Sequence, residues 1–273
     1  MEILQIGERP KAYQWDISAT ARQHWNAKAP AKAGNNEITI YDVIGSDGFG
    51  GGFTAKRMDA ALRSIGAKSD VTVKINSPGG DVFEGVAIFN ALKMHEGAVD
   101  VEVMGIAASA ASFIAMAGDS VRMQRGSMLM IHNSWGLVIG NRHDLFRTGE
   151  VLGKIDDAMA GIYADRTGAP RIEIAKMMDN ETFLQAEEAV KMGFVDEAIE
   201  AEKAEDGEDL PKGLAARRKL DALLAEQGVP RSERRRLMRE ASGGTQDAAP
   251  TVTQDADLNV SAMRELINSL TER

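Results

Sequence analysis

The chain of 273 residues contains no cysteine. This absence excludes a disulfide framework, a catalytic thiolate and zinc held by cysteine ligands. Aromatic residues are also few, at 5%. The hydrophobic share of 44% and the charged share of 27% are nevertheless ordinary for a globular protein, and the length suits one large domain with or without an appendage.

Positive charge is in deficit, and long apolar runs are missing. The formal net charge of −9 argues against general affinity for nucleic acid or an anionic membrane. No apolar run reaches the roughly 20 residues that a membrane-spanning helix needs. The first residues, MEILQIGERPK, have neither the basic start nor the apolar stretch of a secretory signal. We therefore expect a cytoplasmic protein that binds neither nucleic acid nor membrane.

Composition divides the chain into three parts. Residues 1–35 are weakly patterned and end in a linker-like stretch, so we expect an N-terminal arm there. Residues 36–199 carry regular strand and helix patterns and are predicted to form one domain. Residues 200–273 are charged and polar, which predicts a flexible, partly helical tail that is disordered over 243–257. Its helical segments are expected at 214–228, 232–242 and 258–273.

The pattern within 36–199 is that of strand–helix–strand units, which predicts an α/β fold with a mainly parallel sheet and right-handed crossovers. The expected strands are 37–45, 70–76, 99–105, 119–124 and 127–133. The expected helices are 54–66, 81–95, a helix over the small residues from Gly105 to Gly118, and a long helix over 141–166. The long helix carries an apolar stripe that suits packing against a partner subunit. The stripe consists of Leu145, Leu152, Ile155, Met159 and Ile162.

Two serines, Ser109 and Ser112, stand in a run of small apolar residues, VMGIAASAASFIAMAG. A hydroxyl in apolar surroundings must find a partner or it costs stability. Both hydroxyls could bond locally to backbone carbonyls of a buried helix. Alternatively, one of them is a nucleophile that is held where water is scarce. The segment alone favours local hydrogen bonding of both serines. Whether one of them is a nucleophile depends on a base elsewhere in the chain.

Acyl transfer by a serine needs a base, usually histidine. Of the four histidines, His24 lies in the arm, His95 ends a helix and His143 lies in a charged run. His132 instead follows the apolar strand MLMI at its carboxyl end, where parallel sheets bind ligands. Either a catalytic or a hydrogen-bonding structural role fits this position.

Backbone donors for a developing oxyanion are offered by two turns. NSPGG at 76–80 is a glycine-containing turn directly before a helix. The alternative is that this segment is a tight turn without a catalytic role. The N–H of Ala110 follows Ser109 at a helix start, where the helix dipole favours negative charge. A second glycine-rich loop, GSDGFGGGFTAKR, lacks the phosphate-binding pattern and is expected to border a substrate groove.

Four segments resemble, in order and in separation, the motifs of the Clp protease proteolytic subunit (ClpP). They are INSPGGDVFEGVAIFNAL, GIAASAASFIAMAG, MLMIHNSWG and FLQAEEAVKMGFVDE. The resemblance covers about residues 37–198. From IHNSW onward the chain is more similar to the ClpP-like head maturation proteases of tailed bacteriophages.

The resemblance implies a ClpP/crotonase-like fold of repeated ββα units, with a projecting long helix that assembles subunits into rings. Ser109 matches the nucleophile and His132 the general base. Gly80 and Ala110 match the backbone donors of the oxyanion hole. The resemblance implies no metal and no cofactor.

The third member of the triad departs from the family pattern. Where ClpP has an aspartate two residues before the phenylalanine of its F-L-S-A motif, this chain has Glu181 before Phe183. Glutamate can also orient an imidazole and stabilise its cation. Glu181 is therefore the predicted acid, and Asp179 is the alternative. The Ser112 hydroxyl is then predicted to form a local hydrogen bond to a backbone carbonyl.

The implied function is serine endopeptidase activity on polypeptides, in phage prohead maturation with scaffold or capsid protein as substrate. One alternative is a housekeeping ClpP-type subunit that works with an ATPase. Another is a capsid scaffold or assembly protein with an inert protease domain, motivated by the charged tail. A crotonase-type enzyme acting on acyl-CoA would leave Ser109 and His132 unexplained, and no basic cluster favours nucleotide binding.

Overall fold

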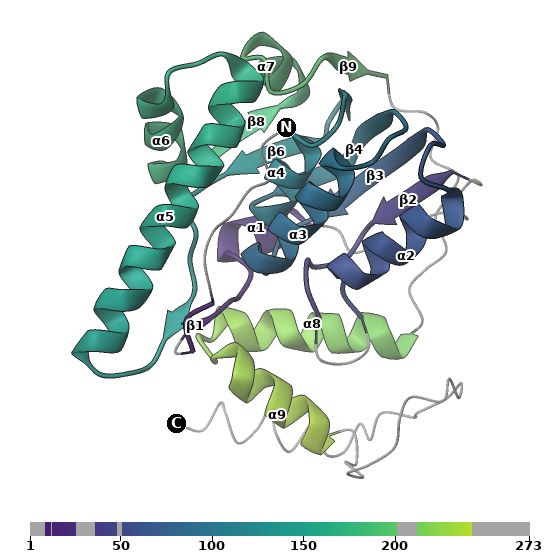
Figure 1. Ribbon diagram of the computed structural model, residues 1–273. Coiled ribbons are helices and arrows are strands. Elements are labelled where there is room, and N and C mark those ends of the chain that lie inside the picture. The colour runs from purple at the N-terminus through teal and green to yellow at the C-terminus, as the bar shows by residue number, and fades with distance from the viewer. Residues whose placement is uncertain (1–8, 12, 26–35, 48–50, 201–211, 242–273) are drawn as a thin grey trace. The chain divides into compact units, whose positions relative to one another are not determined.

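The computed structural model describes residues 9–11, 13–25, 36–47, 51–200 and 212–241 (Figure 1). The chain divides into two compact units, with the division between Glu208 and Asp209. The larger unit holds the sheet, and the smaller holds two helices. The predicted domain boundaries after residues 35 and 199 stay predictions.

The larger unit is built on a seven-stranded sheet that is parallel except at one pairing. Five strands follow in the order β2-β3-β4-β5-β9, β6 pairs with the far end of β4, and β8 pairs antiparallel with β6. The strands are β2 (Glu37–Ile40), β3 (Val71–Ser77), β4 (Val99–Ala108), β5 (Ser120–Gln124), β6 (Met128–Ile131), β8 (Thr182–Gln185) and β9 (Glu197–Ile199). The predicted α/β fold with a mainly parallel sheet is thereby confirmed.

Figure 1 shows α2, α3 and α4 along one face of this sheet, and the long helix α5 extending beyond it. The helices of this layer are α2 (Ala55–Ile65), α3 (Val82–Lys93), α4 (Ala110–Ala115), α5 (Arg142–Thr167), α6 (Arg171–Asp179) and α7 (Ala186–Lys191). Their ends follow local chemistry. Thr54 accepts a hydrogen bond from the N–H of Arg57 at the start of α2, and Asn141 forms a capping box with Asp144 at the start of α5. Gly168 ends α5 in the left-handed conformation.

The core lies between the sheet and these helices. Alternate residues of β3, such as Val73 and Ile75, are completely buried, as are Phe113 and Ile114 of α4. Burial of such side chains contributes about 1.5–3 kcal/mol each. Of the apolar stripe of α5, Ile155 and Met159 are buried in this core, whereas Leu145 is 50% exposed.

The helix expected from Gly105 to Gly118 is wrong in its first part. Strand β4 continues through Ala108, and α4 begins only at Ala110. Residues Ile106, Ala107 and Ala108 pair in parallel with β6, so they belong to the sheet. A buried apolar run has no polar face, and its periodicity cannot distinguish strand from helix.

The arm carries structure that its weak pattern did not predict. Strand β1 (Tyr13–Gln14) pairs antiparallel with β7 (Leu137–Val138), and α1 spans Ala19–His24. Arm side chains form a second apolar cluster with the sheet. Its buried members are Tyr13, Trp15, Ile17, Ala21, Val43, Ile106, Ala108 and Met130. A two-residue strand leaves too little pattern to be found from sequence.

The described part of the smaller unit is a helical hairpin of α8 (Lys212–Glu226) and α9 (Arg231–Ala241). Arg234 of α9 donates hydrogen bonds to Asp221 of α8 and to the carbonyl of Val229. The disorder predicted over 243–257 and the helix predicted over 258–273 lie outside the described residues. No helix among the described residues is both long and apolar enough to cross a membrane.

A buried pair of hydroxyls joins α4 to α5. Ser112 Oγ lies 2.6 Å from the carbonyl oxygen of Ser109 and 2.7 Å from Tyr163 Oη. Since the Ser112 proton goes to the carbonyl, the tyrosine donates to Ser112. Both residues are inaccessible to solvent, and burial raises the pKa of Tyr163. Ser112 is thus a structural residue that supports the turn at Ser109.

This arrangement predicts non-additive effects on stability. We expect Ser112→Ala to cost about 1–3 kcal/mol of unfolding free energy, because it leaves the Tyr163 hydroxyl buried without an acceptor. Tyr163→Phe should cost about 0.5–1.5 kcal/mol, and the double variant should cost less than the sum by about 0.5–1.5 kcal/mol. Urea unfolding of all four chains measures the cycle. Simple additivity would contradict the bond.

Candidate active site

Ser109 lies at the turn between β4 and α4, where the backbone is strained. Its φ of 55° and ψ of −123° lie in a region that non-glycine residues rarely adopt. The N–H of Ser109 donates to the carbonyl of Met130, 3.0 Å away, which fixes the turn to β6. Such strain persists only where the surroundings enforce it, and it is common at sites of chemistry. The turn presents the Ser109 hydroxyl at the carboxyl edge of the sheet.

His132 directly follows β6, and the parallel pairing of β4 with β6 brings it to the same edge. The pairing aligns Ala108 with Met130, so both strands end side by side. His132 Nε2 lies 2.8 Å from Ser109 Oγ. The imidazole is only 4% exposed. A serine hydroxyl is therefore in hydrogen-bond contact with a shielded imidazole, which is the geometry of nucleophile and base.

Glu181 reaches His132 through the antiparallel pairing of β6 with β8. Ile131 pairs with Thr182, so the residues one step further, His132 and Glu181, face each other. The distance from His132 Nδ1 to Glu181 Oε1 is 3.7 Å, and the carboxylate is 47% exposed. This is an ion-pair distance rather than a tight hydrogen bond. The second carboxylate oxygen accepts a hydrogen bond from Thr20 of α1 at 3.0 Å.

Asp179, the alternative acid, has a different partner. Its Oδ1 accepts a hydrogen bond from Asn133 Nδ2 at 2.8 Å, and its side chain is exposed at the end of α6. The structure therefore brings Glu181, not Asp179, to the free nitrogen of His132.

The other histidines have other surroundings. His24 contacts the ring of Phe183, His95 Nε2 lies 2.7 Å from the carbonyl oxygen of Ser69, and His143 is exposed on α5. The predicted pair of Ser109 and His132 is thus brought together without a competing imidazole in the described contacts.

Two opposing effects set the protonation of His132. Burial lowers the pKa of its imidazole below the usual value, and this effect outweighs the charge of Glu181, which raises the pKa. The imidazole is consequently neutral at pH 7 and can accept a proton. The carboxylate becomes more important once the imidazole is charged, since it then balances a cation that has little access to water.

Backbone N–H groups of two turns flank Ser109. Ala110 is the first residue of α4, so its N–H has no acceptor within the helix. A Cβ atom added at Gly79 would lie 2.9 Å from the nitrogen of Ala110 and 2.7 Å from Ser109 Cβ. The 77–80 turn therefore packs closely against Ser109. The N–H of Ile44 donates to the carbonyl oxygen of Gly79, and the carbonyl oxygen of Ile44 accepts from the N–H of Asp81. Because these two bonds flank Gly80, the N–H of Gly80 points away from Ile44. Gly80 and Ala110 both line the pocket beside Ser109, and their role as oxyanion donors stays a prediction.

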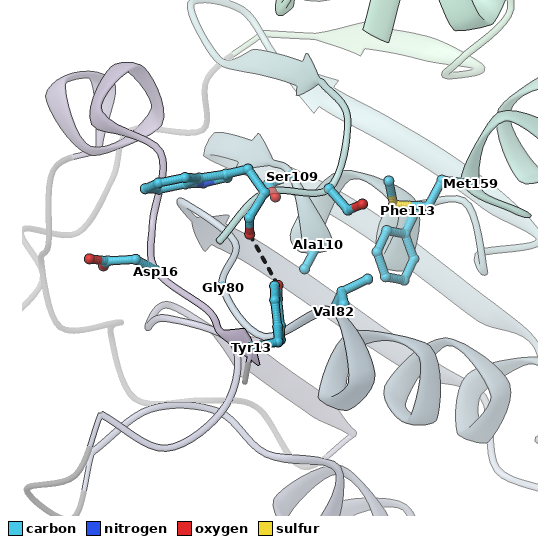
Figure 2. A pocket seen from close by; sticks show the side chains of 10 residues that line it. Tyr13, Asp16, Gly80, Val82, Ser109, Ala110, Phe113 and Met159 are labelled. Atoms are coloured by element: carbon cyan, nitrogen blue, oxygen red, sulfur yellow. Dashed lines mark hydrogen bonds between the residues drawn. The ribbon is translucent and has the colours of Figure 1, made fainter. Parts of the chain in front are cut away.

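A small pocket opens beside Ser109, and Figure 2 shows its lining. Apolar side chains of α3, α4 and α5 form one wall, namely Val82, Phe113 and Met159. Tyr13 and Asp16 of the arm line it too, although the sequence pattern gave no signal for them. Ser134 and Trp135 complete it. Polar and apolar groups contribute to this lining in about equal measure.

The loop after His132 is tied to α5 through Asp156. The backbone N–H and the hydroxyl of Ser134 both donate to Asp156 Oδ1, at 2.6 and 2.7 Å. Burial raises the pKa of Asp156, and the two hydrogen bonds work against that rise. The segment that carries β7 is therefore held to the long helix.

Metal ligation is not indicated by the arrangement. Within the described residues, no group of three or more histidine, aspartate and glutamate side chains is placed to hold a metal ion. Serine, imidazole and backbone N–H groups are the chemical groups that converge at this edge of the sheet.

Comparison with known proteins agrees with the fold. The sequence model of the family described as Clp protease matches residues 56–202. An ATP-dependent Clp protease proteolytic subunit from Pleurastrum terricola is 38% identical over 133 residues, which cover 48% of this chain and 67% of the relative. The same subunit from Deinococcus radiodurans is 30% identical over 141 residues, which cover 51% and 69%. The chain therefore belongs to the Clp protease family.

Proposed function

We propose that this chain is a serine endopeptidase in which Ser109 is the nucleophile, His132 the general base and Glu181 the acid that orients the imidazole. The proposal depends above all on one observation, the 2.8 Å contact between Ser109 Oγ and His132 Nε2 at a strained turn. Membership of the Clp protease family supports it.

The reaction follows from these positions. His132 Nε2 accepts the proton of Ser109 as Oγ attacks a peptide carbonyl carbon. The N–H groups of Gly80 and Ala110 donate to the oxyanion of the tetrahedral intermediate. The C–N bond then breaks as the imidazolium protonates the leaving amine, and an acyl-enzyme remains. Water, deprotonated by His132, hydrolyses the ester and restores the hydroxyl.

Ring assembly through α5 is part of the proposal. The N-terminal half of this helix and the loop before it expose large apolar side chains, which is costly in a monomer and typical of a surface that meets another subunit. They are Ile139 at 68%, Leu145 at 50% and Phe146 at 70% exposure. Assembly of such subunits would restrict access to the sites and limit hydrolysis to polypeptides that can enter.

A role in phage prohead maturation is the finer proposal. The resemblance of the segment after His132 to head maturation proteases motivates it, and the separate α8–α9 unit fits a chain that is trimmed during assembly. The names of the two relatives, ATP-dependent Clp protease proteolytic subunits, fit equally a subunit that works with an ATPase. An inert scaffold role would not require the Ser109–His132 contact.

Removal of the nucleophile provides the first test. We expect Ser109→Ala to abolish labelling by a fluorophosphonate and to lower peptide hydrolysis by about 10⁴-fold or more, because no alkoxide equivalent remains. Ser120→Ala, a change on β5 outside the site, should leave both unchanged. Labelling that persists in Ser109→Ala, located by peptide mass mapping, would assign the nucleophile elsewhere.

The pH dependence distinguishes the two acids. Because the pKa of His132 is depressed, the rate should fall only as the pH drops below about 6.5, when the imidazole becomes protonated. Glu181→Gln removes an effect that raises this pKa, so the acidic limb should move to lower pH. The plateau of kcat should fall about 10- to 100-fold, less than for a fully buried acid. Asp179→Asn is the matched control, and a larger effect of that change would reverse the assignment.

The intact mass of the purified protein distinguishes a role in prohead maturation from that of a housekeeping ClpP-type subunit. We expect purified wild-type protein to be cut within 200–273, whereas Ser109→Ala stays at its full mass of 29.4 kDa. Wild-type protein that keeps its full mass but hydrolyses peptides would instead favour the ATPase-dependent alternative. Denaturing mass spectrometry after storage at several concentrations makes this comparison.

A further inference from the structure

The described part of the arm, residues 9–11 and 13–25, touches each of the segments that form the proposed active site. Along the arm, the contacts begin at the 77–81 turn, pass the segment after His132 and β8, and return to Asn76 of β3. They are Arg9 to Asp81 at 2.6 Å, Tyr13 Oη to the carbonyl of Trp135 at 3.0 Å, Thr20 to Glu181 at 3.0 Å, His24 against Phe183 with ring centroids 4.9 Å apart, and Trp25 Nε1 to the carbonyl of Asn76 at 2.9 Å.

The arm meets the segment after His132 as a paired strand. Tyr13 pairs with Val138 and Gln14 with Leu137, antiparallel. Among the described strands, β7 has β1 as its only partner. Strand β7 begins a few residues beyond His132, so its edge leads directly to the base. An unpaired edge at this place would bind any extended chain by backbone hydrogen bonds.

Side chains of the arm alternate as those of a bound peptide do. Tyr13, Trp15 and Ile17 are buried, with 5%, 6% and 8% exposure, whereas Gln14 between them is exposed. Alternation of this kind places every second side chain against the protein. Tyr13 lies edge-on to Phe83 and lines the pocket beside Ser109, as Figure 2 shows, where the dashed line marks its hydrogen bond to Trp135. Trp15 packs so closely on Gly45 that a Cβ there would lie 3.1 Å from its ring.

We propose that the arm occupies the groove between the edge of β7 and the 77–81 turn in the resting chain, and that a polypeptide substrate binds only by displacing it. The side chain that the arm places beside Ser109, Tyr13, indicates the substrate class, an extended segment with a large aromatic side chain at that position. This inference rests on the proposed peptidase function, since it concerns the same site.

The backbone pairing of the arm is short, so a substrate that exchanges with the arm has to replace mainly its buried side chains. The ladder between β1 and β7 is two residues long, and a two-stranded ribbon of that length is barely stable by itself. The ion pair of Arg9 with Asp81 is partly open to solvent on the arginine side, where exposure is 41%. The tether nevertheless keeps the arm at a high effective concentration, so short peptides should compete poorly with it.

A disulfide across β1 and β7 tests whether the arm must leave. The chain has no cysteine, so Gln14→Cys with Leu137→Cys introduces its only two thiols at paired positions. We expect the oxidised full-length protein to hydrolyse peptides and to react with a fluorophosphonate about 10-fold or more slowly than the reduced protein. Reduction should restore both rates, and Gln14→Cys alone should show no redox dependence.

The outcomes separate this inference from the proposed function. Equal rates in the oxidised and reduced states, with Ser109→Ala inactive, would overturn the groove assignment and leave the peptidase intact. Absence of labelling at Ser109 in both states would instead overturn the peptidase. Thiols that remain free under oxidant, as measured by alkylation and mass, would contradict the β1–β7 pairing itself.

Substitutions within the arm test the substrate class. Tyr13→Ser with Trp15→Ser should raise the rate of fluorophosphonate labelling about 10-fold, because the side chains that hold the groove are gone. Gln14→Ser is the matched control on the exposed face and should change nothing. A peptide with the sequence of residues 9–25 should inhibit the double variant competitively, and the same peptide with both aromatic residues replaced by serine should not. Equal inhibition by both peptides would refute the proposed preference.

Discussion

The pairing of β6 with two different strands is the constraint on which the site depends. Its parallel ladder to β4 places the ends of both strands at one edge, and its antiparallel ladder to β8 returns the chain to that edge from the opposite direction. Ser109, His132 and Glu181 each stand just outside the ladder, at the residue where one of these strands ends or begins. A slip of one residue in either pairing would turn a side chain to the other face of the sheet and separate the three groups.

Strain at the nucleophile is held by packing on every side. The positive φ of Ser109 is enforced by its N–H bond to Met130 behind it and by the bonds from Ser112 to its carbonyl ahead of it. Gly79 contacts the same turn so closely that any side chain would collide with Ala108 and Ala110. The small residues around Ser109 are therefore required by the geometry. They let the 77–80 turn approach Ser109, and this explains why a hydroxyl lies in a run that otherwise resembles buried core.

Much of this arrangement could be predicted from sequence, because short-range chemistry determined it. Thr54 and Gly66 mark the ends of α2, and the strand before His132 predicted that its imidazole lies at the carboxyl edge. The structure places that imidazole beside Ser109, while the catalytic roles stay predictions. Other features depend on partners distant in sequence. The extension of β4 to Ala108 is decided by its pairing with β6, and the position of Glu181 rather than Asp179 beside His132 follows from the register with β8, neither of which any local pattern contains.

The arm is a second case in which contacts distant in sequence, rather than the local pattern, determine the structure. Tyr13, Trp15 and Ile17 alternate over five residues, but only Tyr13 and Gln14 pair as a strand. The burial of these three side chains becomes understandable only against residues distant in sequence that share their apolar cluster, such as Val43, Ile106 and Met130. A chain with this edge uncovered would expose an unpaired strand, which favours aggregation. The arm covers the edge through a ladder of two residues, and its buried side chains supply the rest of its binding. A longer chain that displaced the arm would have to replace both kinds of contact.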